Sequence, residues 1–214
     1  KKQALEAGEM RELIDMEIKT ADKKKLNNFG GLQQARDLLT LMLLLQGIGF
    51  ADLIHLKTKE LNKNQRGQYF LHFRRQKTGT ELTIQVSSEA MAIIQRYRSK
   101  DLSSLYLLDL LDWRSRGEEA YHEYRRQLRH FNYNLSRLAM FCNIGANVSS
   151  YTARHTWATL AKYCEIPEEV ISEGLGHSSL EVTRTYLKRF ENEKLNKANK
   201  IIFDYVFKGN KKLW

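Results

Sequence analysis

The sequence is poor in residues that interrupt or cross-link a chain. Its 214 residues include a single proline, Pro167, and no stretch rich in proline, glycine and serine that would separate two domains. The two cysteines, Cys142 and Cys164, form neither a CxxC pair nor a zinc-binding spacing. We therefore expect one compact domain without a disulfide scaffold, with both cysteines reduced and in the core.

Long hydrophobic runs are missing as well. The longest, LMLLLQGIGF (41–50), is interrupted by Gln46 and is too short to cross a bilayer. The first residues, KKQALEAGEM, lack the pattern of a signal peptide. No His/Cys/Asp cluster has metal-ligand spacing, and the chain contains neither a Walker loop nor a GxGxxG motif. We expect a cytoplasmic protein that needs no membrane, metal or cofactor.

Negative charge is in deficit. Lys and Arg number 35 against 25 Asp and Glu, a net charge of +10, which favours a polyanionic partner such as nucleic acid or an anionic membrane surface. Residues 57–77 hold seven basic side chains and one acidic one, Glu60. The seven are Lys57, Lys59, Lys63, Arg66, Arg74, Arg75 and Lys77. Such a segment suits a phosphate backbone, although a solvated edge strand has a similar composition.

The hydrophobic periodicity predicts a mostly helical chain. Helical spacing occurs in seven segments: 9–18, 32–46, 88–99, 117–142 (one helix or two), 151–164, 167–176 and 191–207. Segment 32–46 is apolar nearly all round, which predicts a buried central helix. In 67–86, apolar residues alternate with polar ones on both sides of QKTG, which predicts a β-hairpin. The expected fold class is mainly α with a small antiparallel β-sheet (α+β).

A few polar residues stand where phosphoryl transfer by a tyrosine would need them. Tyr151 and Arg154 open a predicted helix, whose first turn favours anions, and an arginine there binds two phosphate oxygens at once. Lys77 is at the tip of the hairpin, and Tyr186 follows His177 by nine residues. A nucleophile, cations and a proton donor are the groups this chemistry requires. Taken singly, each has a plainer explanation, such as a salt bridge, a turn lysine, a helix cap or a core tyrosine.

Taken together, the motifs resemble those of a known family. ARHTWAT, LGHSS and a tyrosine nine residues after that histidine resemble the C-terminal half of the tyrosine recombinase (phage-integrase family) catalytic domain. The QKTG hairpin is similar to the one that carries the family's lysine, and GFADLIHLK is similar to its first motif. The resemblance spans roughly residues 9–190, and YTARHTWA is closest to integrases of mobile elements in the Bacteroides group. It implies the fold of DNA breaking-rejoining enzymes and a reaction without metal or nucleotide.

The resemblance also implies a role for each residue. Tyr186 would attack the scissile DNA phosphate and form a 3′-phosphotyrosine. Arg154 would hold the non-bridging oxygens, Lys77 would protonate the departing 5′-oxygen, and His177 would hydrogen-bond the phosphate. Tyr151 stands where the family usually has histidine, and a phenol is a poor base near neutral pH.

Beside Arg154, His155 matches a family position that is usually structural. Weaker contacts to DNA phosphates are expected from four basic residues: Lys57, Arg74, Arg75 and Arg184.

The first motif lacks its arginine. Most members carry it three residues before the acidic residue, here Asp52, and Bacteroides-type relatives carry it six residues before; these positions hold Gly49 and Gln46. A glutamine can donate one hydrogen bond to a phosphate but brings no charge, and one lost oxyanion donor costs about 3–4 kcal/mol. Either another cation replaces the arginine, or the protein is slow or inactive, or Gln46 is an engineered change. The candidate cations are Lys57, Arg36 and Arg184.

The resemblance divides the chain into two parts. We expect residues 1–190 to form the catalytic domain, and 191–214 a helical tail that docks on its own chain or on a neighbouring protomer. The family's N-terminal core-binding domain is absent, so we expect the chain to be a fragment. The expected partner is double-stranded DNA, with a monomer in isolation and a homotetramer on DNA, at the nucleoid of a bacterial cytoplasm.

Two alternatives remain open. The first is a non-catalytic DNA-binding protein on the same fold, which the missing arginine favours and the intact Arg154, His177 and Tyr186 oppose. The second is a helical scaffold or RNA-binding protein whose motif match is accidental. It predicts that Tyr186, Arg154 and Lys77 lie far apart in space.

Overall fold

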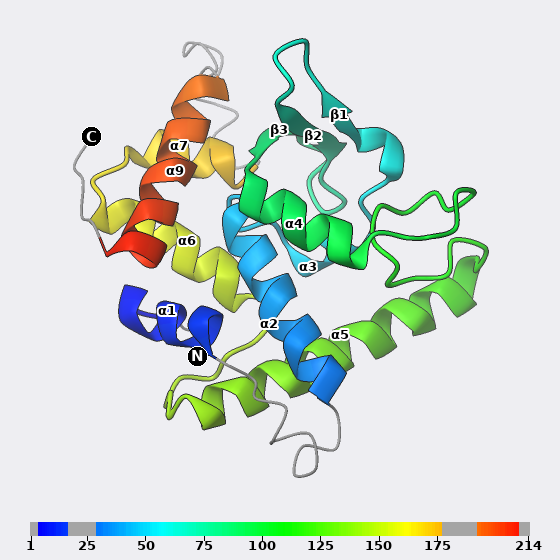
Figure 1. Cartoon of the computed structure of the whole chain (residues 1–214), viewed down its shortest axis with the longest axis horizontal. Coiled ribbons are helices and arrows are strands. Elements are labelled where there is room, and N and C mark those ends of the chain that lie inside the picture. The colour runs from blue at the N-terminus through cyan, green and yellow to red at the C-terminus, as the bar shows by residue number, and fades with distance from the viewer. Residues whose placement is uncertain (1–3, 17–28, 177–191, 210–214) are drawn as a thin grey trace.

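A mostly apolar helix occupies the middle of the molecule (Figure 1). The computed structural model of the chain describes residues 4–16, 29–176 and 192–209. The central helix α2 (Phe29–Leu44) contacts α1 (Ala7–Asp15), α4 (Ser88–Tyr97), α5 (Gly117–Phe141) and α6 (Thr152–Tyr163). Every residue from 37 to 48 is buried, which confirms the predicted buried helix and follows from its mostly apolar surface.

Within the described residues, the sheet has three antiparallel strands in the order β1-β2-β3. They are β1 (Leu61–Lys63), β2 (Tyr69–Arg74) and β3 (Glu81–Val86). Cross-strand partners on the face toward the core are all apolar: Tyr69 with Val86, Leu71 with Ile84, and Phe73 with Leu82. This alternation confirms the predicted hairpin. Strand β1 was not predicted, because three residues are too few to show a periodicity.

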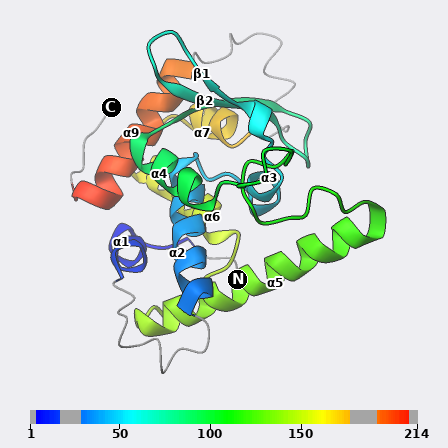
Figure 2. The same ribbon diagram turned by 45° about the vertical axis from the view of Figure 1, so that its right-hand side comes forward.

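The remaining elements complete a mostly helical fold. They are α3 (Phe50–Ile54), the short 3₁₀ helix η2 (Thr58–Glu60), α7 (Glu168–Gly174) and α9 (Asn192–Lys208). Helices α6, α7 and α9 pack on one another, and α9 also contacts α1 and β3. Helix α5 is one continuous helix, and Figure 2 shows it extending beyond the rest of the molecule. The predicted fold class, mainly α with a small antiparallel sheet, is confirmed.

Helix α9 is fixed to its own chain by polar contacts as well as by its apolar face. The Asn199 amide donates to the Leu44 carbonyl at 2.6 Å and accepts from Nε1 of the fully buried Trp157 at 3.1 Å. Arg11 of α1 donates to the Tyr205 carbonyl at 3.0 Å, near the C-terminal end of α9. Docking of the tail on a neighbouring protomer stays a prediction.

The two cysteines differ in environment. Both are free thiols; Cys164 is buried, whereas Cys142, after the last residue of α5, is only half-buried. Burial raises the pKa of the Cys142 thiol. The expectation of two core cysteines is therefore right for Cys164 and wrong for Cys142. Within the described segments, no helix combines the length and hydropathy needed to cross a membrane.

Candidate active site

A cavity of about 840 Å³ opens between α3, the β2–β3 turn, the N-terminal half of α5 and the start of α6. Its lining includes Asp52, Lys77, Tyr151 and Arg154. These residues come from three separate segments of the chain, and the fold brings them to one place. An accidental motif match predicts that Arg154 and Lys77 lie far apart, and this cavity contradicts that prediction.

The turn between α2 and α3 lies against the first turn of α6, which carries Arg154. Gln46 and Gly47 have φ of 57° and 68°, and the Gly47 amide donates to the Met42 carbonyl at 2.9 Å, which ends the helix in the left-handed conformation that favours glycine. A Cβ on Gly47 would lie 3.1 Å from both Arg154 Cα and Trp157 Cβ. The glycine therefore lets α6 pack directly on this turn.

Arg154, in the first turn of α6, is held by backbone carbonyls. Its guanidinium donates to Gly47 O at 3.2 Å and also to Leu175 O. Burial, together with the positive charge of Arg75, lowers the pKa of Arg154 to about 10. The protonated side chain is thus poorly compensated by the protein, and a bound anion would stabilise it.

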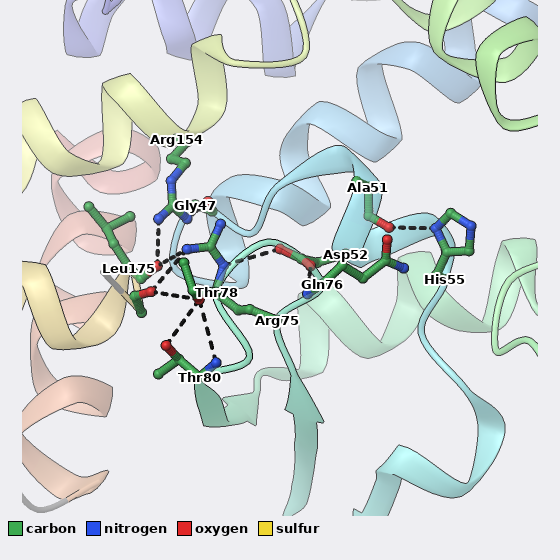
Figure 3. Close-up of polar contacts among 11 residues, drawn as sticks. Gly47, Ala51, Asp52, His55, Arg75, Gln76, Thr78, Thr80, Arg154 and Leu175 are labelled. Atoms are coloured by element: carbon green, nitrogen blue, oxygen red, sulfur yellow. Dashed lines mark hydrogen bonds and ion pairs between the residues drawn. The ribbon is translucent and has the colours of Figure 1, made fainter. Parts of the chain in front are cut away.

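Asp52 ties the hairpin turn to α3. Its buried carboxylate accepts hydrogen bonds from Arg75 Nε at 3.2 Å and from the backbone N–H of Gln76 at 2.9 Å. On the other side of the turn, the Thr78 hydroxyl donates to Gly176 O at 3.2 Å (Figure 3). Lys77 lies between these two anchors, exposed and at the edge of the cavity. The backbone that carries the lysine is fixed, while its side chain remains accessible.

Gln46 lies elsewhere. Its side chain is 1% exposed, its amide nitrogen donates to the Leu195 carbonyl of α9 at 3.4 Å, and it does not line the cavity. Its Oε1 has no hydrogen-bond partner among the described residues. The expectation that Gln46 donates to a phosphate does not fit this placement. Gly49, the other position considered for the missing arginine, does line the cavity but has no side chain to donate.

The family model of the phage integrase family matches residues 5–193 of the chain. The chain belongs to the phage integrase family. A tyrosine recombinase of Pseudothermotoga lettingae is 33% identical over 66 residues, which are 31% of this chain and 23% of that protein.

Two solved structures share the fold. The integrase of mycobacterium phage Brujita superposes with a TM-score of 0.58 at 11% identity, over 94% of this chain and 58% of that one. The site-specific recombinase XerH, in a post-cleavage complex with a palindromic difH substrate, superposes with a TM-score of 0.54 at 18% identity, over 94% of this chain and 53% of that one. The chain thus spans little more than half the length of these solved relatives.

The basic residues predicted to contact DNA have different environments in this phage integrase domain. Lys57 is exposed and outside the cavity lining, and Arg74 is exposed and paired with Glu81 at 2.6 Å. Arg75 is buried and lines the cavity, and its contact with a DNA phosphate stays a prediction. Arg36 is bound to Asp37 and to the Met16 carbonyl, outside the cavity, so it does not replace the missing arginine.

Tyr151 and His155 lie on the solvent side of α6. Tyr151, the N-cap residue, is 51% exposed and lines the cavity. His155 is exposed, its ring centroid is 6.4 Å from that of Tyr151, and it is outside the cavity lining. Three predicted site residues, His177, Arg184 and Tyr186, lie outside the described residues, although Leu175 and Gly176, which directly precede His177, border the site.

Sequence reasoning missed four aromatic residues of the lining, one of which is the buried Phe50 of α3. Tyr121 and Tyr124 of α5 and His55, which follows α3, face the cavity. Burial and the neighbouring Tyr151 raise the pKa of Tyr124. Tyr121, Tyr124 and Leu128 recur at i, i+3 and i+7, the spacing of one helix face, but that spacing does not say which surface the face meets. The described residues contain no group of three or more His, Cys, Asp or Glu side chains able to hold a metal.

Proposed function

We propose that this chain is the catalytic domain of a site-specific DNA recombinase, which cleaves and rejoins DNA strands through a 3′-phosphotyrosine at Tyr186. The observation that carries the proposal is the cavity shared by Arg154 and Lys77. Among the described residues, its charged lining consists of three cations, Arg75, Lys77 and Arg154, and one anion, Asp52. A site with this excess of positive charge suits a single phosphodiester.

In the proposed reaction, the Tyr186 hydroxyl oxygen attacks the scissile phosphorus and the bond from phosphorus to the 5′-oxygen breaks. Lys77 gives a proton to that leaving oxygen, while Arg154 and His177 stabilise the charge on the non-bridging oxygens. A 5′-hydroxyl of the partner strand then attacks the phosphotyrosine, and the tyrosine leaves. One phosphodiester is broken and one is made, so the exchange needs no nucleotide.

The test is covalent trapping on a nicked duplex built from the DNA that flanks the gene. After cleavage, the short fragment beyond the nick diffuses away, and the protein stays attached to the DNA on a denaturing gel. We expect an adduct from the wild-type chain, with any missing N-terminal domain restored, and none from Tyr186→Phe. Binding of the same duplex without an adduct in either protein would overturn the proposal.

A second candidate function is specific DNA binding without cleavage. The observation that favours it is the buried Gln46, which leaves the first motif without a donor at the cavity. It predicts that a footprint forms at one site in the flanking DNA and that no adduct accumulates there. The same gel therefore separates the two functions.

We further propose that the chain comes from a mobile element of the Bacteroides type and assembles as a homotetramer on DNA at the bacterial nucleoid. The YTARHTWA sequence supports the first proposal. The genomic neighbourhood tests it, because an element should end in repeats near the gene. Native mass spectrometry with and without duplex tests the assembly: four protomers per two duplexes are expected, and a single protomer per duplex at all concentrations would contradict it.

A further inference from the structure

We propose that Arg75 supplies the positive charge that the first motif lacks, by binding a non-bridging oxygen of the scissile phosphate beside Arg154. This inference rests on the recombinase function proposed above and assigns one more catalytic residue to it. The sequence places Arg75 two residues before Lys77, within a run of basic residues of the hairpin. In the structure, Arg75 is buried whereas the other basic residues of that run are exposed.

Burial distinguishes Arg75 from its neighbours. The Arg75 side chain is 9% exposed, whereas that of Arg74 is 69% exposed. Side chains alternate between the faces of a strand, so residue 75 continues the inward series of Leu71 and Phe73. An arginine in this series carries a charge into the protein, where it requires compensation.

The protein compensates this charge only in part. Arg75 donates through Nε to Asp52 at 3.2 Å, and through Nη1 to the carbonyls of Leu175 and Gly176, both at 3.0 Å. None of the hydrogen bonds among the described residues uses Nη2. The guanidinium is thus fixed through Nε and Nη1 and retains the donors of Nη2.

Arg75 and Arg154 converge on the same carbonyl. Both donate to Leu175 O, and Figure 3 shows the two guanidinium groups next to Leu175, with Asp52 on the far side of Arg75. Two cations lie together with one carboxylate, and the charge of Arg75 contributes to the lowered pKa of Arg154. Such a pair is unfavourable until an anion lies between them, and both residues line the cavity.

Gly176 makes room for this arrangement. A Cβ at residue 176 would lie 2.7 Å from Arg75 Cδ, so a side chain there would displace the arginine. The glycine immediately precedes His177 in the sequence. The segment that leads into the proposed catalytic histidine is therefore built against Arg75.

The experiment measures single-turnover cleavage by Arg75→Gln once the cleavage position has been mapped. The matched control is Arg96→Gln, which also removes an arginine from an ion pair with a buried aspartate, Asp37, away from the cavity. We expect Arg75→Gln to slow cleavage by about 100-fold or more, the effect of one lost oxyanion donor. Arg96→Gln should cleave about as fast as the wild type.

Two modified substrates separate a charge contact from a structural role. A methylphosphonate at the scissile position removes the negative charge, and we expect it to narrow the gap between wild type and Arg75→Gln by about tenfold or more. A 5′-bridging phosphorothiolate needs no proton donor for its leaving sulfur. It should rescue Lys77→Ala but leave the Arg75→Gln defect unchanged.

Other outcomes overturn the inference. Rescue of Arg75→Gln by the phosphorothiolate would mean that Arg75 only positions Lys77, and an equal defect on all substrates would mean a structural role. If Arg75→Gln cleaved as fast as Arg96→Gln and the wild type, Arg75 would have no role in cleavage. If Arg75→Gln fails to fold because it leaves the buried Asp52 charge unpaired, the double variant Asp52→Asn/Arg75→Gln, which removes both charges, is measured instead. If the wild type formed no adduct, both the recombinase function and this inference would be wrong. If the wild type formed an adduct but Arg75→Gln gave one of the contradicting results above, only this inference would be wrong.

Discussion

At the scale of single residues, cations outnumber anions in the described lining of the site, and backbone carbonyls accept hydrogen bonds from two of the cations. Arg154 is held by two carbonyl oxygens, which accept its hydrogen bonds but carry no net charge. The only described anion in the cavity lining, Asp52, is shared with Arg75 and the Gln76 amide. The described lining therefore leaves one positive charge at this position without a matching anion.

Sulfate should consequently stabilise the folded protein through Arg154. The pKa of Arg154 in the folded protein, about 10, is lower than in the unfolded chain. The charged Arg154 side chain therefore destabilises the fold to the full extent below pH 10, and this cost falls only as the pH rises above that value. At ten times its Kd, sulfate should add about 1.4 kcal/mol to the free energy of unfolding. This corresponds to a rise in Tm of about 3–6 °C.

Thermal denaturation in sulfate and in chloride of equal ionic strength measures this effect. Sulfate also stabilises proteins by exclusion from their surface, so Arg154→Gln is the control that reports this general part. The specific rise should be the same at pH 7 and pH 9. An equal rise in Arg154→Gln would contradict anion binding at the site.

Gly47→Ala should destabilise the fold through the α2–α3 turn. The alanine would have to adopt φ near 68° and place its Cβ 3.1 Å from two atoms of α6. Left-handed strain and overpacking together should cost about 2–4 kcal/mol. Gly79→Ala is the matched control, because Gly79 has the same φ of 68° and a Cβ there would meet no heavy atom within 4 Å.

Urea denaturation of both variants separates strain from packing. We expect Gly79→Ala to lose about 1 kcal/mol, the conformational part alone. Equal losses in the two variants would show that the contact of Gly47 with α6 contributes nothing.

At the scale of secondary-structure elements, the site depends on how a few segments are tied together. Helix α3 holds the hairpin through Asp52, and the segment after α7 holds it through the Gly176 carbonyl. Helix α6 carries Arg154 and is fixed in turn by α9, through Trp157 and Asn199. A helix near the C-terminus thereby supports a site to which none of its described side chains contributes.

Asn199→Ala should therefore loosen α6 and α9 together. It leaves the buried Trp157 Nε1 and the Leu44 carbonyl without partners, and each unsatisfied group costs about 1–3 kcal/mol. We expect at least about 2 kcal/mol less stability in urea, whereas the exposed neighbour Lys200→Ala should change it by less than about 0.5 kcal/mol. Similar values for the two would mean that α9 is held by its apolar face alone.

At the scale of the whole molecule, the net charge of +10 should govern DNA affinity. If five phosphates are contacted, the logarithm of the binding constant should fall with the logarithm of salt concentration at a slope of about −4.5. Fluorescence anisotropy with a labelled duplex measures this slope. A slope near zero would rule out a phosphate-dominated interface.

The basic edge of the sheet can be tested in the same titration. Lys63 and Arg66 are exposed on and after β1, so Lys63→Ala/Arg66→Ala should reduce the slope by about 1.8 if both contact phosphates. An unchanged slope would mean that this edge is only solvated. The same double substitution should leave urea stability unchanged within about 0.5 kcal/mol.

Local patterns allowed much of the fold to be predicted. The strand alternation placed Leu71, Phe73, Leu82 and Ile84 correctly, because a strand side chain has only two faces to choose from. The apolar residues on nearly all sides of α2 predicted a buried helix. Motif spacing predicted that Arg154 and Lys77 belong to one site, although it could not predict which other residues line that site.

The sequence by itself determined which chemical groups the chain brings, through the order and spacing of its motifs. The tertiary structure alone decided where the charges of the site lie. Gln46, one of the two positions considered for the missing arginine, is buried against α9, while Arg75, predicted only as a weak contact to DNA phosphates, is buried beside Arg154. The physical reason is distance along the chain: Arg75 is fixed by a carboxylate 23 residues away and by carbonyls 100 and 101 residues away, and no local pattern reports such contacts.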